Sequence, residues 1–108
     1  MTDKKNTISL QQMNNPSTDI KLVEKAMNAI ADPCRLSILQ EIYSKGEICC
    51  SDVQSLTGLS QPTCSHHIKL LSESTLIECK KKGRNQIITL NKDTFKKVSV
   101  FLEKFCEA

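Results

Sequence analysis

The stretch LTGLSQPTCSHHIKLL, residues 56–71, decides the fold of this 108-residue chain. Gly58 ends one short helix, and Ser60 is placed to cap the next, with Pro62 in its first turn. Apolar side chains then recur on one helical face, at Cys64, Ile68 and Leu71. Two helices joined by a short glycine-containing turn are typical of a helix-turn-helix, whose second helix reads DNA.

Two further helices are predicted ahead of this motif. The first follows a cap at Thr18 or Asp19, and its apolar stripe consists of Ile20, Val23, Met27 and Ile30. The second begins with Asp32 as N-cap and ends at Gly46. Ser51 is the predicted N-cap of the short helix that ends at Gly58. Residues 1–18 are polar without periodicity, which predicts a flexible arm ahead of one domain at 19–108.

The segment after the motif changes its period. Residues 76–90 alternate apolar and polar side chains around a charged turn that contains Gly83, and this pattern predicts a β-hairpin. A last helix over about 92–106 carries an apolar stripe at Phe95, Val98, Leu102 and Phe105. The expected fold is therefore mainly α with a small β-hairpin, in the order α-α-α-α-β-β-α of a winged helix-turn-helix.

Charge favours a polyanionic partner. The formal net charge is +3, and residues 60–90 alone account for it, because the rest of the chain sums to zero. There is no long apolar run and no secretory signal, so a cytoplasmic protein without membrane contact is expected. The six cysteines are then expected to be reduced thiols. There is no glycine-rich phosphate loop and no plausible nucleophile–base set, so neither an enzyme nor a small-molecule substrate is expected.

The segments ADPCRLSIL, GEICCSDV, LTGLSQPTCSHHIKLL and KKKGRNQIITL resemble the ArsR/SmtB family of bacterial winged-helix repressors. The resemblance covers roughly residues 20–106. It implies a homodimer that represses an operon until an inducer, often a metal ion or metalloid, binds. It also implies that the first and last helices pair in the dimer, which places at the interface Ile20, Val23, Met27, Phe95, Val98, Leu102 and Phe105.

Double-stranded operator DNA is the expected partner. A recognition helix needs short polar side chains near its N-terminus, and the candidates here are Ser60, Gln61, Thr63, Ser65, His66, His67 and Lys69. Gln61 suits bidentate reading of adenine. His66 and His67 point about 100° apart on a helix and do not readily share a metal. On the hairpin tip the candidate DNA contacts are Lys80, Lys82 and Arg84.

The inducer site departs from the family's pattern. Family members that sense arsenic, cadmium or lead carry an ELCxCDLC-like motif, which the run EICCSDVQ resembles only in part. Cys49 matches the first thiol, Ser51 stands at the second position, and Cys50 lies between them. The candidate ligands of a thiolate-bound metal or metalloid, with arsenite favoured, are therefore Cys49 and Cys50. No cysteine precedes Cys34, so the N-terminal arm adds no third thiol and a complete local three-thiolate site is not evident.

Other readings of the thiols stay open. A persulfide- or oxidant-sensing subgroup pairs a last-helix cysteine, matched here by Cys106, with a position that is Gln40 in this chain. Cys34, beside Arg35, is the alternative partner. It lies roughly 9 Å from the Gln40 position along the axis of the second helix. Cys64 is expected in the core and Cys79 in a structural role. A site assembled from distant cysteines, a family member without a sensor, and a thiol protein that does not bind DNA are the remaining alternatives.

Overall fold

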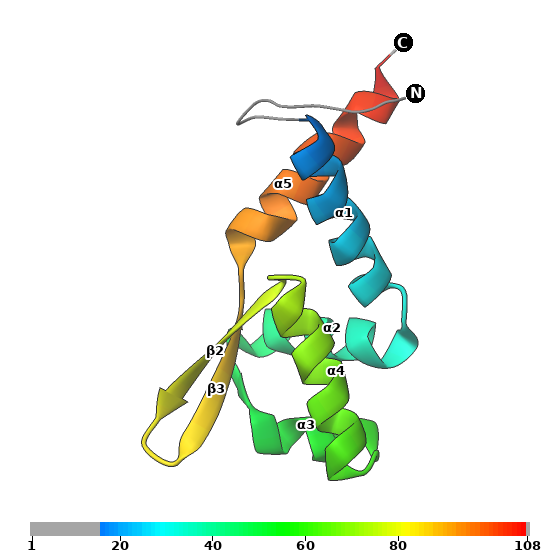
Figure 1. Ribbon diagram of the computed structural model, residues 1–108. Helices are drawn as coiled ribbons and strands as arrows, with labels where there is room; N and C mark the ends of the chain where they lie inside the picture. The colour runs from blue at the N-terminus through cyan, green and yellow to red at the C-terminus, as the bar shows by residue number, and fades with distance from the viewer. Residues whose placement is uncertain (1–15, 108) are drawn as a thin grey trace.

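The computed structural model describes the backbone of residues 16–107 and the side chains of residues 20–107 (Figure 1). In chain order the elements are α1 (Pro16–Ile30), α2 (Pro33–Lys45), β1 (Ile48–Cys49), α3 (Cys50–Thr57), α4 (Gln61–Glu73), β2 (Ile77–Lys82), β3 (Asn85–Leu90), α5 (Lys92–Glu103) and the 3-10 turn η1 (Lys104–Cys106). The predicted order of helices and hairpin is confirmed, with one short strand added. Most of the predicted flexible arm, residues 1–15, lies outside the described residues.

The ends of α2 follow from its sequence. The Asp32 carboxylate accepts a hydrogen bond from the Arg35 N–H at 3.0 Å, and Pro33 occupies the first turn. Gly46 ends the helix with φ +86°, and its N–H donates to the carbonyl of Ile42 at 2.7 Å. Only glycine adopts such a φ without strain, so both predicted boundaries are confirmed.

Two predicted helix starts are wrong. α1 begins at Pro16, a residue suited to the first helical position, so Thr18 and Asp19 lie within the helix instead of capping it. α3 begins at Cys50 with Cys49 as its N-cap, two residues ahead of the predicted cap Ser51. The reason is tertiary, because the residues just before α3 are fixed by pairing with β3. The Asp52 carboxylate supports this start by accepting from the Cys49 N–H at 3.0 Å.

The sheet has three antiparallel strands in the order β1-β3-β2. β2 and β3 pair from Ile77↔Leu90 to Lys82↔Asn85, and Gly83 has φ +67° in the turn between them. This hairpin extends from the helical body as a wing (Figure 1). β1 was not predicted, because two residues are too short to show a strand period and pair only once β3 is in place.

The core is aliphatic, as the scarcity of aromatic residues in the sequence implies. Its largest fully buried side chains come from α2, α3, α4, the α4–β2 connection and β3, namely Ile38, Ile42, Val53, Leu71, Leu76 and Ile88. Each such side chain contributes about 1.5–3 kcal/mol to folding by leaving water. The core therefore joins the helix-turn-helix to the base of the wing.

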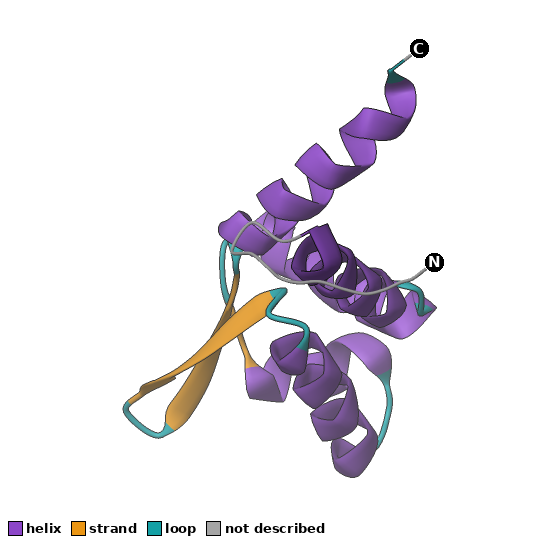
Figure 2. Ribbon diagram, turned by 45° about the horizontal axis from the view of Figure 1, so that its top comes forward, coloured by secondary structure: helices purple, strands orange, loops and turns teal. Residues whose placement is uncertain are grey.

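α1 and α5 pack together above this body, and the C-terminal end of α5 extends beyond it (Figures 1 and 2). Val23 and Val98, two of the predicted interface residues, are buried within the chain itself, and Phe95 is half-buried. The others remain exposed, and they are Ile20, Met27, Leu102 and Phe105. The dimer interface stays a prediction, with these exposed side chains as its available apolar surface. No helix among residues 16–107 is both long and apolar enough to cross a membrane.

Candidate functional site

The N-terminal half of α4 presents polar side chains to solvent. The exposed side chains here are Gln61, Thr63, Ser65 and His66. A helix that reads DNA needs such accessible polar groups to reach the base edges. Ser60 is the N-cap by position, but its hydroxyl hydrogen-bonds to the Thr63 hydroxyl at 3.0 Å and not to a backbone N–H. The first N–H groups of α4 are thus left for an external acceptor such as a DNA phosphate.

The two adjacent histidines of α4 have different surroundings. His66 is exposed, whereas the His67 side chain is only 12% exposed and faces the start of α2. Nδ1 of His67 lies 3.2 Å from Nη1 of Arg35 and 4.0 Å from a carboxylate oxygen of Asp32. His66 therefore fits the predicted DNA contact better than His67, for which DNA contact stays a prediction.

The wing supplies the second part of the DNA-facing surface. Lys80, Lys82 and Arg84 are exposed on the hairpin, and Lys69 is exposed on α4. Both elements pack on the same body, since β2 contacts α4 directly. The predicted DNA-binding residues are thus accessible on two adjoining elements, with the exception of the inward-facing His67.

A groove of about 550 Å³ lies between α3, α4 and the wing. Its walls include three of the six cysteines, Cys50, Cys64 and Cys79. On the α4 side they also include Gln61, Ser65 and Lys69. The groove therefore connects a group of thiols with side chains of the reading helix.

Strand register decides which thiols share this groove. Cys79 pairs with Ile88 of β3, and Cys50 Sγ donates to the side-chain oxygen of Gln86 at 3.3 Å. Residues two apart in a strand lie on one face, so Cys50 and Cys79 are on the same side of the sheet. Cys49 pairs with Ile87 and belongs to the opposite face. The geometry favours Cys79, which sequence reasoning assigned a structural role, over Cys49 as the partner of Cys50.

The electrostatics of the groove agree with this grouping. Burial raises the pKa of the Cys50 thiol, and the negative charges of Cys79 and Cys49 raise that pKa further. Burial likewise raises the pKa of Cys79. Both groups are therefore protonated thiols at neutral pH. Cys64 is 4% exposed and hydrogen-bonds within the helix-turn-helix, to Thr57 and Leu59, which agrees with its predicted place in the core.

The thiols considered for redox chemistry lie apart within the chain. Cys106 is exposed in η1 at the end of the chain, whereas Cys34 is half-buried in the first turn of α2 (Figure 1). Cys34 instead lies beside Asp32 and His67, with ligand atoms of all three residues within 4.8 Å of one another. Sequence reasoning missed this grouping, because nothing in the sequence signals that α4 packs on the start of α2.

The geometry thus defines a protein of the winged helix-turn-helix DNA-binding class, with thiols beside its recognition helix α4. A family model described as a helix-turn-helix domain matches residues 30–80. The arsenical resistance operon repressor of Staphylococcus xylosus is 37% identical over 71 residues, which cover 66% of this chain and 67% of the relative. The corresponding repressor of Bacillus subtilis is 31% identical over 72 residues, covering 67% of this chain and 69% of the relative.

Solved structures agree. A crystal structure of an ArsR family transcriptional regulator superposes with a TM-score of 0.74 at 26% identity, covering 82% of this chain and 90% of the other. A homodimeric winged helix-turn-helix domain from Mycobacterium bovis, at 21% identity, shares the fold with a TM-score of 0.67 over 90% of each chain. This chain belongs to the ArsR/SmtB family and is an ArsR-type transcriptional repressor. That membership also confirms the prediction that it is not an enzyme.

Proposed function

We propose that this chain represses an operon as a homodimer on operator DNA and is released by a thiophilic metalloid or metal that binds Cys50 and Cys79. Arsenite is the favoured inducer. The observation that carries the proposal is the groove between α3, α4 and the wing, because it is lined both by the two thiols and by side chains of the reading helix, including Gln61, Ser65 and Lys69.

Reading of DNA is assigned to the N-terminal half of α4 and to the wing. Gln61, Ser65 and His66 are exposed where a recognition helix meets base edges, and Gln61 suits adenine. Arg84 and the exposed wing lysines suit contacts with phosphate or the minor groove. The polar reading face supplies specificity, and the basic wing supplies affinity that falls with salt.

Dimerisation is assigned to α1 and α5. Ile20 and Phe105 are 50% and 70% exposed, and Met27 and Leu102 add to this apolar surface. Apolar surface of this kind is typical of a homodimer interface. A structure from Mycobacterium bovis with the same fold is homodimeric, which supports a homodimer here. Two copies would place two α4 helices on successive half-sites of DNA.

The chemistry of arsenite suits two neighbouring protonated thiols. Arsenous acid, As(OH)₃, condenses with the Cys50 and Cys79 thiols, so that two As–S bonds form and two As–O bonds break. Each thiol proton leaves in a water molecule, and neither arsenic nor sulfur changes oxidation state. The raised pKa of both thiols is thus no obstacle to arsenite, whereas a metal dication must displace the two protons.

Release follows from where the two sulfurs are anchored. Cys50 is the first residue of α3, and Cys79 lies in β2 of the wing. Both β2 and α3 also contact α4. Bonds from one arsenic to both sulfurs therefore pull α3 and the wing together beside α4. The spacing between the reading helix and the wing then no longer matches DNA, a small shift of the kind that switches such contacts.

Two alternatives to arsenite sensing in the groove stay open. An oxidant- or persulfide-sensing repressor would use Cys106 with another thiol, and the exposure of Cys106 favours its reactivity. The C-terminal end of the chain, which contains Cys106, lies away from α2, which contains Cys34 (Figure 1), and this weighs against that pair unless the partner subunit supplies the second thiol. A family member without a sensor would bind DNA and ignore every inducer.

A mobility shift with the chain's own promoter DNA tests the proposal. Reduced wild-type protein should bind, and arsenite should release it. The double variant Cys50→Ser/Cys79→Ser should bind equally and stay bound when arsenite is added. Cys49→Ser is the matched control, because it changes a neighbouring thiol on the other sheet face and should still respond.

Each contrary result points to a different alternative. If the double variant is still released by arsenite, the groove is not the inducer site. Release by persulfide or peroxide that depends on Cys106 supports the redox reading. Binding that no tested agent reverses supports a repressor without a sensor, and absence of DNA binding refutes the whole proposal.

A further inference from the structure

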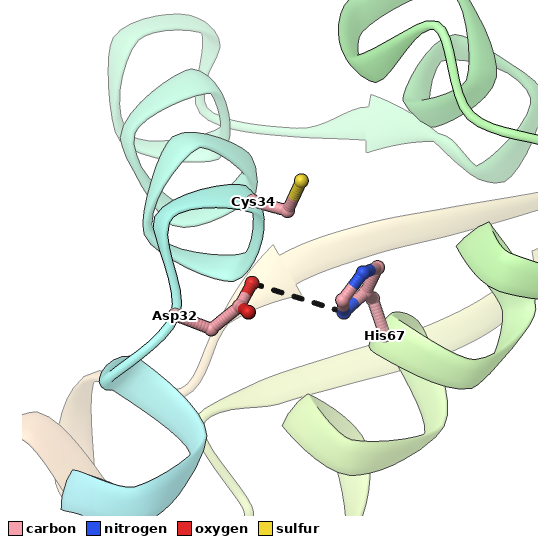
Figure 3. A group of neighbouring side chains, drawn as sticks. All are labelled: Asp32, Cys34 and His67. Carbon is pink, nitrogen blue, oxygen red and sulfur yellow. Dashed lines mark ion pairs between the residues drawn. The ribbon is translucent and has the colours of Figure 1, made fainter.

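The junction between the start of α2 and the middle of α4 brings together three different metal-binding side chains. They are Asp32, Cys34 and His67, and Figure 3 shows Asp32 and His67 facing each other across the space between the two helices, with Cys34 beside them on α2. All are half-buried, and their ligand atoms lie within 4.8 Å of one another. None of them lines the groove that holds Cys50 and Cys79.

We infer that Asp32, Cys34 and His67 form a binding site for one divalent cation of borderline softness, such as Zn²⁺. One carboxylate oxygen, one thiolate and one imidazole nitrogen are each a ligand that zinc accepts. Three protein ligands leave a fourth position for water, which the partial exposure of the site allows. The site is separate from the proposed arsenite groove and stands or falls without it.

The distances fit this assignment after a small closure. Bonds of the usual zinc lengths place tetrahedral ligand atoms roughly 3.3–3.7 Å apart. The Asp32 oxygen and Nδ1 of His67 are 4.0 Å apart, and no pair of ligand atoms exceeds 4.8 Å. Side-chain rotations that move each ligand atom by about an ångström are sufficient to reach the spacing of zinc ligands. The backbone is already fixed, because Asp32 caps α2 and His67 lies within α4.

Arg35 holds the site together when no cation is bound. Its Nη1 lies 3.2 Å from Nδ1 of His67, its Nε donates to the carbonyl of Ala29 at 2.6 Å, and its backbone N–H donates to Asp32. The guanidinium thus places positive charge beside the imidazole, while the backbone N–H of the same residue holds the carboxylate. A cation that takes Nδ1 replaces this hydrogen bond, while the bond to Ala29 can remain. Competition with Arg35 makes the affinity modest and reversible.

The ligand set distinguishes this site from the groove by its preference. A mixed oxygen, sulfur and nitrogen set suits Zn²⁺ and Co²⁺, whereas a pair of thiols suits softer arsenite or Cd²⁺. Binding of Zn²⁺ forms one bond to each ligand and releases the Cys34 proton to water, with no electron transfer. The bound cation would join α2 to α4 directly and fix the orientation of the reading helix on the body.

The test is a titration of reduced, chelator-treated full-length protein with Co²⁺, followed by Zn²⁺ competition. Wild type should bind one equivalent per chain and develop a near-ultraviolet thiolate-to-cobalt charge-transfer band that Zn²⁺ abolishes. Cys34→Ser should lose the band. The double variant Cys50→Ser/Cys79→Ser is the matched control and should keep it. Asp32→Asn retains the cap and should weaken binding at least about tenfold.

A second readout protects the test against damage to the fold. Zn²⁺ should shift the imidazole nitrogen signals of His67 in NMR spectra of wild type, and should not shift them in Cys34→Ser. Far-ultraviolet circular dichroism checks that each variant is folded. If Cys34→Ser does not fold, Cys34→Ala replaces it in the titration. A wild type without the band, a band unchanged in Cys34→Ser, or a band lost only in the Cys50/Cys79 double variant overturns the inference.

Discussion

Two cysteine-containing sites, the groove and the α2–α4 junction, both adjoin the reading helix, and they are chemically unlike. The groove contains Cys50 and Cys79 with amide and hydroxyl neighbours, and both thiols have a raised pKa. The α2–α4 junction contains one thiol, Cys34, with a carboxylate and an imidazole. The same residue type is therefore offered to soft inducers on one side and to borderline cations on the other, because its neighbours differ.

The largest expected effect is on arsenite affinity, which should fall when a groove cysteine is replaced and stay unchanged when Cys34 is replaced. Either Cys50→Ser or Cys79→Ser leaves only one of the two proposed ligand thiols, and loss of the second bond should weaken arsenite binding by about 100- to 1,000-fold. Cys34→Ser should leave that affinity unchanged. Competition with a fluorescent dithiol-reactive arsenical measures all three. An equal loss in Cys34→Ser would merge the two groups into one site.

The next effect sharpens the comparison through protons. Between pH 6 and 8, Cd²⁺ must displace a proton from each of Cys50 and Cys79, since both pKa values lie above the ordinary 9.0. Two released protons make Cd²⁺ affinity rise by up to about 100-fold per pH unit. Arsenite binding releases water and should change little over the same range. Isothermal titration in buffers of different ionisation enthalpy counts the protons released.

How much of this contrast could be read from the sequence depends on the reach of each signal. Local signals placed the caps of α2, the recognition helix and the wing turn, because Asp32, Gly46 and Gly83 act within a few residues. The two cysteine groups arise from contacts between residues far apart, such as Cys50 with Gln86 and Arg35 with His67. Periodicity carries no information on such pairs, so the sequence indicates only Cys49, through its motif match, and its neighbour Cys50.

A smaller effect separates the two arginines, one on each side of the comparison. Arg84 is exposed on the wing, and Arg84→Ala should lower the slope of log affinity against log salt by about 0.9 and weaken binding to every DNA sequence. Arg35 faces Ala29 and His67, so Arg35→Gln should leave the salt slope unchanged. Fluorescence anisotropy at several salt concentrations measures both slopes. An unchanged slope for Arg84→Ala would remove the wing contact.

The smallest expected effect is on the pH dependence of folding stability, which should change in acid for the α2–α4 junction and in alkali for the groove. The backbone N–H and the charge of Arg35 lower the pKa of Asp32 below its usual 3.8, which outweighs desolvation. A lowered folded pKa stabilises the fold above the unfolded value, and this contribution disappears as pH falls through the folded pKa. The stability advantage of wild type over Asp32→Asn should therefore shrink in acid, below about pH 3.8.

The groove thiols give the converse. A pKa raised in the folded state favours the fold below the unfolded value, and that advantage is lost as pH rises past about 9.0. Cys50→Ser should accordingly resist alkaline destabilisation better than wild type while matching it in acid. Urea unfolding across both pH ranges compares the two variants. If both variants deviate from wild type at the same end of the scale, the opposite pKa shifts assigned to Asp32 and Cys50 are wrong and the two regions are not electrostatically distinct.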